Sequence, residues 1–212
     1  MEERAHWVQR TCIAILKGAG IRCRVEGTPP THGLVVSNHL SYLDVLIISS
    51  AMPCFFVAKM EIGGWPVFGK SARIGGTIFL DRSSMASANS VAAVMSERLQ
   101  QPIPVLLFPE GTSTDGSQVL RFHSRLIDPA TKAGVPITAA AVRYILEDGI
   151  PEQKLCWFGN ALFLTHLMKA LGTPSFTASI RFGKPRIYAD RRTAADATHA
   201  EITAMRQPSP LP

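Results

Sequence analysis

The sequence has few charged or aromatic side chains, and its cysteines form no recognisable site. Only 18% of its 212 residues are charged and 8% are aromatic. A face of alternating cations and aromatic rings, as nucleic-acid-binding proteins use, is therefore not expected. The cysteines lack a C-x-x-C pair and stand at Cys12, Cys23, Cys54 and Cys156. This spacing argues against a zinc site and a disulfide framework, so we expect four reduced core residues.

Long hydrophobic runs are also missing. The longest apolar stretch covers residues 45–58, and Ser49, Ser50 and Pro53 interrupt it. It is shorter than the ~20 residues that a membrane-spanning helix needs. The first residues, MEER, lack the basic start and apolar run of a cleavable signal peptide. We therefore expect no transmembrane helix, no signal peptide and a cytosolic location.

The sequence does have enough apolar residues for one full core. Its hydrophobic content is 46%, and no low-complexity tract divides it, which predicts a single domain over residues 1–212. Lysine and arginine outnumber acidic residues, 22 to 16, giving a net charge of +6. Such an excess favours an anionic partner, such as a phosphorylated ligand or an acidic membrane surface, over a neutral one.

The first twenty residues predict a basic amphipathic helix. Val8, Cys12, Ile15 and Leu16 follow helical spacing, with Trp7 beside them and cations elsewhere on the helix. Such a helix either lies in a membrane interface, with the indole at headgroup depth, or packs against its own domain. The pattern alone leaves both interpretations open.

Strand-like and helix-like segments alternate through the rest of the chain. Apolar runs typical of strands lie at residues 34–36, 55–58, 77–80, 104–108, 137–142 and 176–182. Stretches with helical length and composition lie at residues 41–50, 85–99, 125–133, 161–171 and 193–205. This alternation predicts an α/β fold with a largely parallel central sheet flanked by helices. We expect the core over residues 21–190, and a C-terminal helix and tail over residues 191–212.

A histidine and an aspartate five residues apart follow the first of these strands. On one continuous helix, His39 and Asp44 would point roughly 140° away from each other. Here a strand-to-helix turn separates them, because Ser41 is a good N-cap and Asp44 occupies the acidic position of a capping box. The turn therefore permits a contact between them. A neutral imidazole held by a carboxylate can accept a proton from an alcohol near neutral pH.

The same spacing occurs a second time, at His123 and Asp128, without a comparable strand before it. Spacing alone does not distinguish the two pairs, but position does. Ligands of parallel sheets sit beyond the carboxyl ends of the strands. His39 follows such an end, and so do two further polar segments, at residues 81–82 and 109–112. We therefore favour His39.

The polar residues at these strand ends suit an anionic ligand. The planar guanidinium of Arg82 can hold a phosphate monoester, and Lys59 would add a second positive charge. Alternatively, Arg82 pairs with Asp81 or with a surface acid. Gly111 permits a positive φ or the close approach of a ligand to the backbone. Glu110 then either supports the site, accepts a substrate hydroxyl, or is a solvated turn residue.

Four ordered blocks in this sequence resemble those of the glycerolipid acyltransferases. The blocks are NHLSYLD at residues 38–44, GTIFLDR at 76–82, FPEGT at 108–112 and VPI at 135–137. The similarity extends over residues 22–184, and within the family the blocks resemble the bacterial 1-acylglycerol-3-phosphate O-acyltransferases. Between the first two blocks, Lys59, Glu61, Pro66 and Gly69 fit the same family.

The resemblance implies acyl transfer from acyl-CoA or acyl carrier protein to the free hydroxyl of 1-acylglycerol-3-phosphate, giving phosphatidic acid, without a metal or cofactor. It makes His39 the general base and Asp44 the residue that orients it. The implied acceptor-binding residues are Lys59, Arg82, Glu110, Gly111 and Thr112. Backbone N–H groups at a helix N-terminus near Ser41 are candidates to stabilise the oxyanion. Membrane contact is expected to be peripheral, at the cytoplasmic face, through the N-terminal helix.

One departure from the family pattern leaves the acceptor open. Many members have Phe-Lys and then Gly after the third block, whereas this chain has Phe122-His123-Ser124-Arg125. A related lysolipid, including one with an amino-acid headgroup, would need the same base. Two other functions stay open: a thioesterase or esterase that uses water, and a non-catalytic lipid-binding module. The lack of G-x-S-x-G argues against a serine hydrolase.

Overall fold

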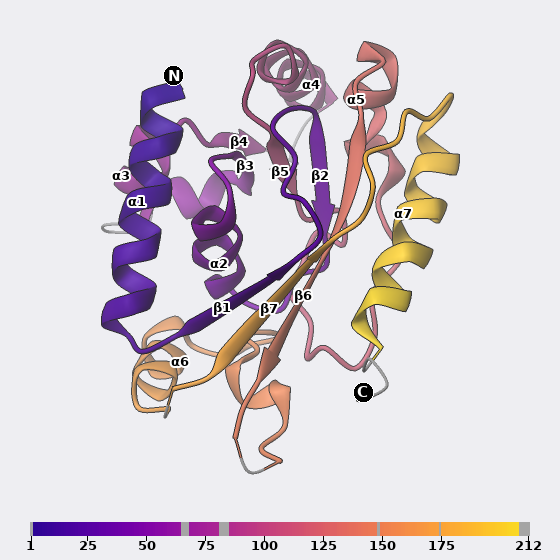
Figure 1. Ribbon diagram of the computed structural model, residues 1–212. Helices are drawn as coiled ribbons and strands as arrows, with labels where there is room; N and C mark the ends of the chain where they lie inside the picture. Colours follow the sequence, from indigo (N-terminus) through magenta and orange to yellow (C-terminus); the bar gives the residue numbers. More distant parts are fainter. Residues whose placement is uncertain (1, 65–67, 81–84, 148, 174, 208–212) are drawn as a thin grey trace.

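A mostly parallel sheet forms the centre of the molecule (Figure 1). The computed structural model describes residues 2–64, 68–80, 85–147, 149–173 and 175–207. The seven strands of the sheet are β1 (Arg22–Glu26), β2 (Leu34–Ser37), β3 (Phe55–Lys59), β4 (Ile78–Leu80), β5 (Val105–Leu107), β6 (Ile137–Ile145) and β7 (Thr177–Phe182). Their order is β1-β7-β6-β2-β5-β3-β4. The strands from β6 to β4 run parallel, and among the strand pairings of the described residues only that of β6 with β7 is antiparallel. The predicted fold class is confirmed.

Helices cover both faces of the sheet (Figure 1). They are α1 (Glu2–Gly18), α2 (Leu43–Ala51), α3 (Phe68–Ile74), α4 (Met85–Leu99), α5 (Asp128–Ala133), α6 (Phe163–Leu171) and α7 (Arg191–Arg206). Side chains alternate along each strand, so β2 sends Val35 into the cluster with α1 and α2. Leu34 and Val36 enter the opposite cluster, with α4, α5 and α7. Burial on both faces explains why β2 is apolar throughout.

A glycine holds β2 in register with its neighbour β6. Gly33 has φ +85°, and a Cβ there would lie 2.3 Å from the carbonyl oxygen of Pro136. The Leu34 N–H donates to that same oxygen at 2.9 Å. The close approach requires glycine, since a side chain would clash with backbone. This contact fixes where β2 begins, and the 4 residues of the strand then lead to the turn that carries His39.

Several element boundaries differ from the sequence prediction. The helix expected over residues 41–50 begins at Leu43, because the preceding residues wrap around the side chain of Asp44. The stretch expected over residues 125–133 is divided into a 3₁₀ turn, Ser124–Leu126, and the short helix α5. Strand β1 was missed because it is an edge strand with mostly exposed residues, so it lacks an apolar run. Cys23 lies on β1 and is exposed, so the expectation of four core cysteines is wrong there.

Helix α1 packs against α2. It buries Ala5, Cys12 and Leu16, while Trp7 and Ile15 stay exposed. The helix therefore packs on its own domain, and its contact with a membrane stays a prediction. Within the part of the chain that the structure describes, no helix combines the length and the apolar character needed to cross a bilayer.

Candidate active site

The turn between β2 and α2 brings His39 and Asp44 together. The imidazole Nδ1 lies 2.8 Å from Asp44 Oδ2, so the contact that their spacing predicts is present. Asp44 is fully buried, whereas the His39 side chain is 21% exposed. Because a carboxylate only accepts hydrogen bonds, Nδ1 carries the proton and Nε2 holds the lone pair. This is the protonation state that a general base needs.

Asp44 is held by three further donors. The N–H groups of Leu40 and Ser41 donate to Oδ2 at 2.7 and 3.0 Å. The Tyr144 hydroxyl donates to Oδ1. Burial, and then the adjacent Asp44 charge, raise the pKa of Tyr144 well above 10, so its hydroxyl stays a donor. Four hydrogen bonds therefore satisfy a buried carboxylate and hold it rigidly against His39.

These contacts correct one expectation from the sequence. The backbone N–H groups near Ser41 were candidates to stabilise an oxyanion. Those of Leu40 and Ser41 are already bound to Asp44, and that of Leu43 points at the Ser41 hydroxyl at 3.4 Å. The start of α2 is thus used to bind the protein's own carboxylate. It offers none of these three groups to a substrate.

The imidazole is also held from its side. The ring of Phe108 stacks on His39 with centroids 4.1 Å apart and an interplanar angle of 19°. Phe108 directly follows β5, the neighbour of β2 in the sheet. Stacking and the Asp44 hydrogen bond together restrict both torsions of the histidine side chain.

Glu110 supports the backbone of the same turn. It is buried, and its two oxygens accept the N–H groups of His39 and Leu120, each at 2.8 Å. Burial raises its pKa above the ordinary value despite these two donors. The contacts favour the supporting role over that of an acceptor for a substrate hydroxyl. Gly111 adopts the positive φ that its place predicts, at +73°, and Thr112 is exposed beside it.

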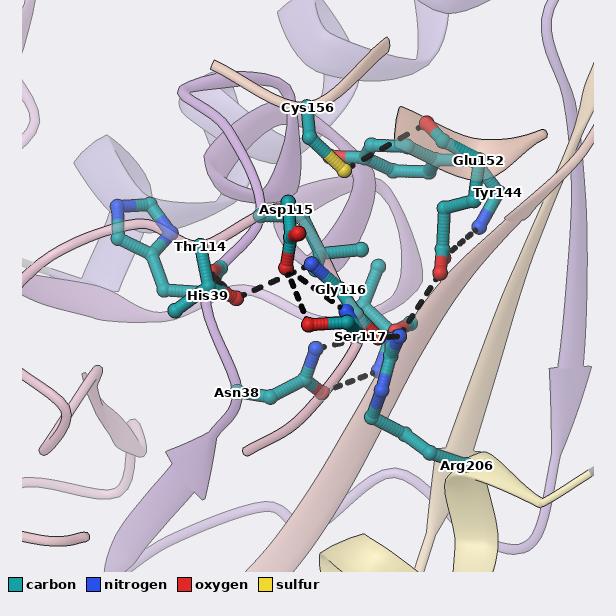
Figure 2. A network of polar contacts seen from close by, with 12 residues as sticks. Asn38, His39, Thr114, Asp115, Gly116, Ser117, Tyr144, Glu152, Cys156 and Arg206 are labelled. Atoms are coloured by element: carbon teal, nitrogen blue, oxygen red, sulfur yellow. Dashed lines mark hydrogen bonds and ion pairs between the residues drawn. The ribbon is translucent and has the colours of Figure 1, made fainter. Parts of the chain in front are cut away.

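A second polar cluster lies behind the turn (Figure 2). Arg206 reaches from α7 and donates to the carbonyl of Gly116 at 2.7 Å, to Glu152 at 2.8 Å and to the carbonyl of Val142. Asn38 pairs with both backbone groups of Val142, at 2.8 and 3.1 Å. The imidazole of His39 points away from this cluster in Figure 2. The cluster thus anchors the backbone around His39 and leaves its ring clear.

The other predicted residues are placed as follows. Lys59 ends β3, but its side chain lies outside the described residues, as does the whole of Arg82. His123 is exposed. Asp128 pairs with Lys132 at 2.7 Å and Arg191 at 3.3 Å, which explains why the second His–Asp spacing makes no equivalent pair.

Sequence reasoning missed Tyr144, Glu152 and Arg206. Tyr144 contacts Asp44, and Glu152 contacts Arg206, in each case across at least 50 positions of the sequence. No local pattern signals such a contact. Position on β6, the neighbour of β2, was the only available indication for Tyr144.

A histidine held by a buried aspartate, at the carboxyl end of a parallel sheet, is typical of an α/β enzyme that uses general-base catalysis. Comparison with known proteins agrees with this class. The family model described as "Acyltransferase" matches residues 21–143. The chain belongs to this acyltransferase family.

Two curated relatives and one solved structure show the range of the family. The chain is 34% identical to a lyso-ornithine lipid O-acyltransferase of Rhodobacter capsulatus, over 94% of this chain and 73% of that protein. It is 37% identical to a 1-acyl-sn-glycerol-3-phosphate acyltransferase of Neisseria gonorrhoeae, over 66% of this chain and 58% of that protein. The crystal structure of PlsC from Thermotoga maritima shares the fold, with a TM-score of 0.69 at 18% identity, covering 98% of this chain and 81% of that one.

Proposed function

We propose that this protein moves a fatty acyl group from an acyl thioester, acyl-CoA or acyl carrier protein, to the free hydroxyl of a lysolipid at the cytoplasmic membrane surface. The observation that carries the proposal is the His39–Asp44 pair, with Nδ1 bound to Oδ2 at 2.8 Å. Family membership supplies the reaction class.

In this mechanism, Nε2 of His39 takes the proton of the acceptor hydroxyl as its oxygen attacks the thioester carbonyl. The imidazolium that forms is stabilised by the buried Asp44. When the tetrahedral intermediate collapses, the C–S bond breaks and the imidazolium returns its proton to the departing sulfur. The products are an ester and a free thiol, and His39 is again neutral.

A lyso-ornithine lipid is the acceptor that we favour. The relative bearing that name aligns with almost the whole chain, including the part beyond residue 143 that the family model does not cover. Phe122-His123-Ser124-Arg125 departs from the Phe-Lys and Gly of many family members, and this departure leaves room for an acceptor other than a phosphorylated one.

The second candidate acceptor is 1-acylglycerol-3-phosphate. The Neisseria relative with that activity in its name is slightly more identical, over a shorter alignment. The block that ends at Arg82 supports this candidate too, because a guanidinium suits a phosphate monoester.

The deciding experiment is an assay of the purified protein with labelled acyl-CoA or acyl carrier protein and each acceptor separately. We expect transfer to lyso-ornithine lipid to exceed transfer to 1-acylglycerol-3-phosphate. His39→Ala should lower the rate by about 10²–10⁴-fold, in a variant that circular dichroism shows to be folded. His32→Ala is the matched control, because His32 is exposed on the loop before β2. A His39→Ala variant as active as the control would refute the mechanism.

Arg82→Ala separates the two acceptors. If a phosphate is bound there, the variant loses use of 1-acylglycerol-3-phosphate, seen as a higher KM for that acceptor. Equal loss with both acceptors would remove the phosphate assignment. Hydrolysis of the donor, with no acylated product from either lipid, would instead support a thioesterase.

A further inference from the structure

Helix α6 carries apolar side chains both on the side that packs against the domain and on the side that faces outward. Its inner face packs against the domain: the rings of Phe163 and His166 contact Tyr42, at centroid distances of 5.0 and 5.5 Å. Its outer face carries Leu164, Met168 and Leu171, at i, i+4 and i+7. A helix packed on a domain surface normally turns polar residues outward. We therefore expect the outer face of α6 to contact an apolar surface outside the domain.

The outer apolar residues of α6 are unusually exposed. Leu164, Met168 and Leu171 are 68%, 63% and 64% exposed, and Leu162, just before the helix, is 75% exposed. We call these four side chains the α6 outer face. By comparison, the apolar side chains left open on α1 are Trp7 and Ile15, at 49% and 47%. An exposed cluster of this kind marks an interaction site, whereas single exposed apolar residues are ordinary.

The α6 outer face lies next to the candidate active site. Tyr42, which contacts the inner face of the helix, belongs to the same turn as His39. Trp157, in the segment leading to α6, donates its backbone N–H to the carbonyl of Leu40 at 2.8 Å. In Figure 1, α6 sits at the end of the sheet where β2 ends. Whatever covers the outer face is thus brought close to His39.

The charged residues near α6 indicate what kind of surface covers the α6 outer face. No acidic residue occurs between Glu152 and Asp190, while Lys154 and Lys169 stand beside and on the helix. Lys169 is exposed next to Met168. A short apolar helix face flanked by cations, in a stretch of sequence without acidic residues, suits the interface of an anionic bilayer.

We propose that the α6 outer face inserts into an anionic lipid surface and that this insertion places membrane-resident lysolipid beside His39. The lipid nature of the acceptor rests on the proposed function. The docking itself does not, since it depends only on the exposed apolar and cationic side chains of α6. This assigns the main membrane contact to α6 and not to the N-terminal helix, most of whose apolar side packs against α2.

The test is co-sedimentation of the full chain with vesicles of equal parts phosphatidylcholine and phosphatidylglycerol. The double variant Leu164→Ser and Met168→Ser should bind these vesicles at least tenfold more weakly, because each serine removes an apolar side chain from the bilayer. Ile187→Ser is the matched control: Ile187 is equally exposed, at 68%, but lies outside α6. Circular dichroism checks that the variants keep the fold.

Three outcomes would overturn the proposal. The first is undiminished vesicle binding by the double variant. The second is loss of binding only in the α1 variant Trp7→Ser and Ile15→Ser, which would assign docking to α1. The third is a dimer in analytical ultracentrifugation that the double variant dissociates, which would make the α6 outer face an interface between copies. If the unmodified protein binds vesicles of phosphatidylcholine alone equally well, the lipid surface need not be anionic, and that part of the proposal is wrong.

The same experiment separates this inference from the proposed function. His39→Ala should sediment with vesicles like the unmodified protein, since it leaves α6 untouched. With a short-chain acceptor dissolved in water, the α6 double variant should keep the transfer rate of the unmodified protein, and only its rate on vesicle-bound acceptor should fall. Absence of transfer in the unmodified protein would refute the proposed function while leaving the vesicle result to decide docking.

Discussion

At the scale of single residues, Asp44 is the centre of the site. It accepts hydrogen bonds from His39, Tyr144 and two backbone N–H groups while fully buried. A buried carboxylate without such donors would be costly and would tend to take up a proton. Because each oxygen is bound, the carboxylate can keep the imidazole in a single tautomer and orientation.

Tyr144 is therefore predicted to be a positioning residue. Tyr144→Phe removes one donor to Asp44 while leaving the ring in the core, so Asp44 and His39 gain freedom. We expect kcat to fall by roughly 10-fold to 100-fold, the cost of a hydrogen bond to a charged group, with the KM of the acceptor unchanged. Tyr188→Phe, in the opposite core cluster, should leave both constants unchanged. A rise in KM with normal kcat would show that Tyr144 serves substrate binding.

At the scale of elements, α6 is joined to the active-site turn through a titratable side chain. His166 is buried, and its Nδ1 lies 3.1 Å from the Tyr42 hydroxyl. Burial, and then the positive charge of Lys169, lower the pKa of His166 below 6.5. The packing of α6 thus favours its neutral form.

Acidification should weaken this contact between α6 and the active-site turn. Because the pKa of His166 is lower in the folded state, the unfolded state binds the proton more tightly. The stability that neutral His166 contributes is present above about pH 6.5. It is lost as the pH falls through the lower pKa that His166 has in the folded state. Between about pH 7.5 and pH 5, the urea midpoint of the unmodified protein should fall more than that of His166→Gln. His32→Gln should behave like the unmodified protein, and equal slopes in all three would contradict the prediction.

At the scale of the whole molecule, Arg206 ties the end of α7 to both the sheet and the loop behind His39. Its guanidinium and Glu152 are largely buried, and Glu152 also accepts the N–H of Tyr144 at 2.7 Å. A continuous set of contacts thus runs from α7 through Glu152 and Tyr144 to Asp44. The C-terminal helix takes part in holding the site, although it is far from His39 in sequence.

Arg206→Ala is expected to lower the free energy of unfolding by about 3–5 kcal/mol, since it leaves Glu152 buried without its cation. Urea denaturation measures this change. Arg191→Ala, which breaks a more exposed pair with Asp128, should cost less than ~1 kcal/mol. Similar losses for both variants would show that the Arg206 contacts contribute no more than a surface ion pair.

Much of the fold was predictable because burial on both faces of a parallel sheet demands apolar runs. The runs at residues 34–36 and 137–142 were recognised as strands for this reason, whereas the exposed edge strand β1 was not. The His39–Asp44 contact was predictable because five residues across a turn are enough to close it. Glu110 was recognised as a site residue, but its role depends on the backbone groups that β2 and the loop before Leu120 bring to it.

By itself, the sequence determined the alternation of strands and helices, the turn that pairs His39 with Asp44, and the motifs that place the chain in its family. All of these depend on interactions among residues a few positions apart. Only the tertiary structure decided that Tyr144 and Arg206 belong to the site and that the α6 outer face is left uncovered next to it. These features depend on which strands become neighbours and which surfaces stay open, and the packing of the whole chain settles both.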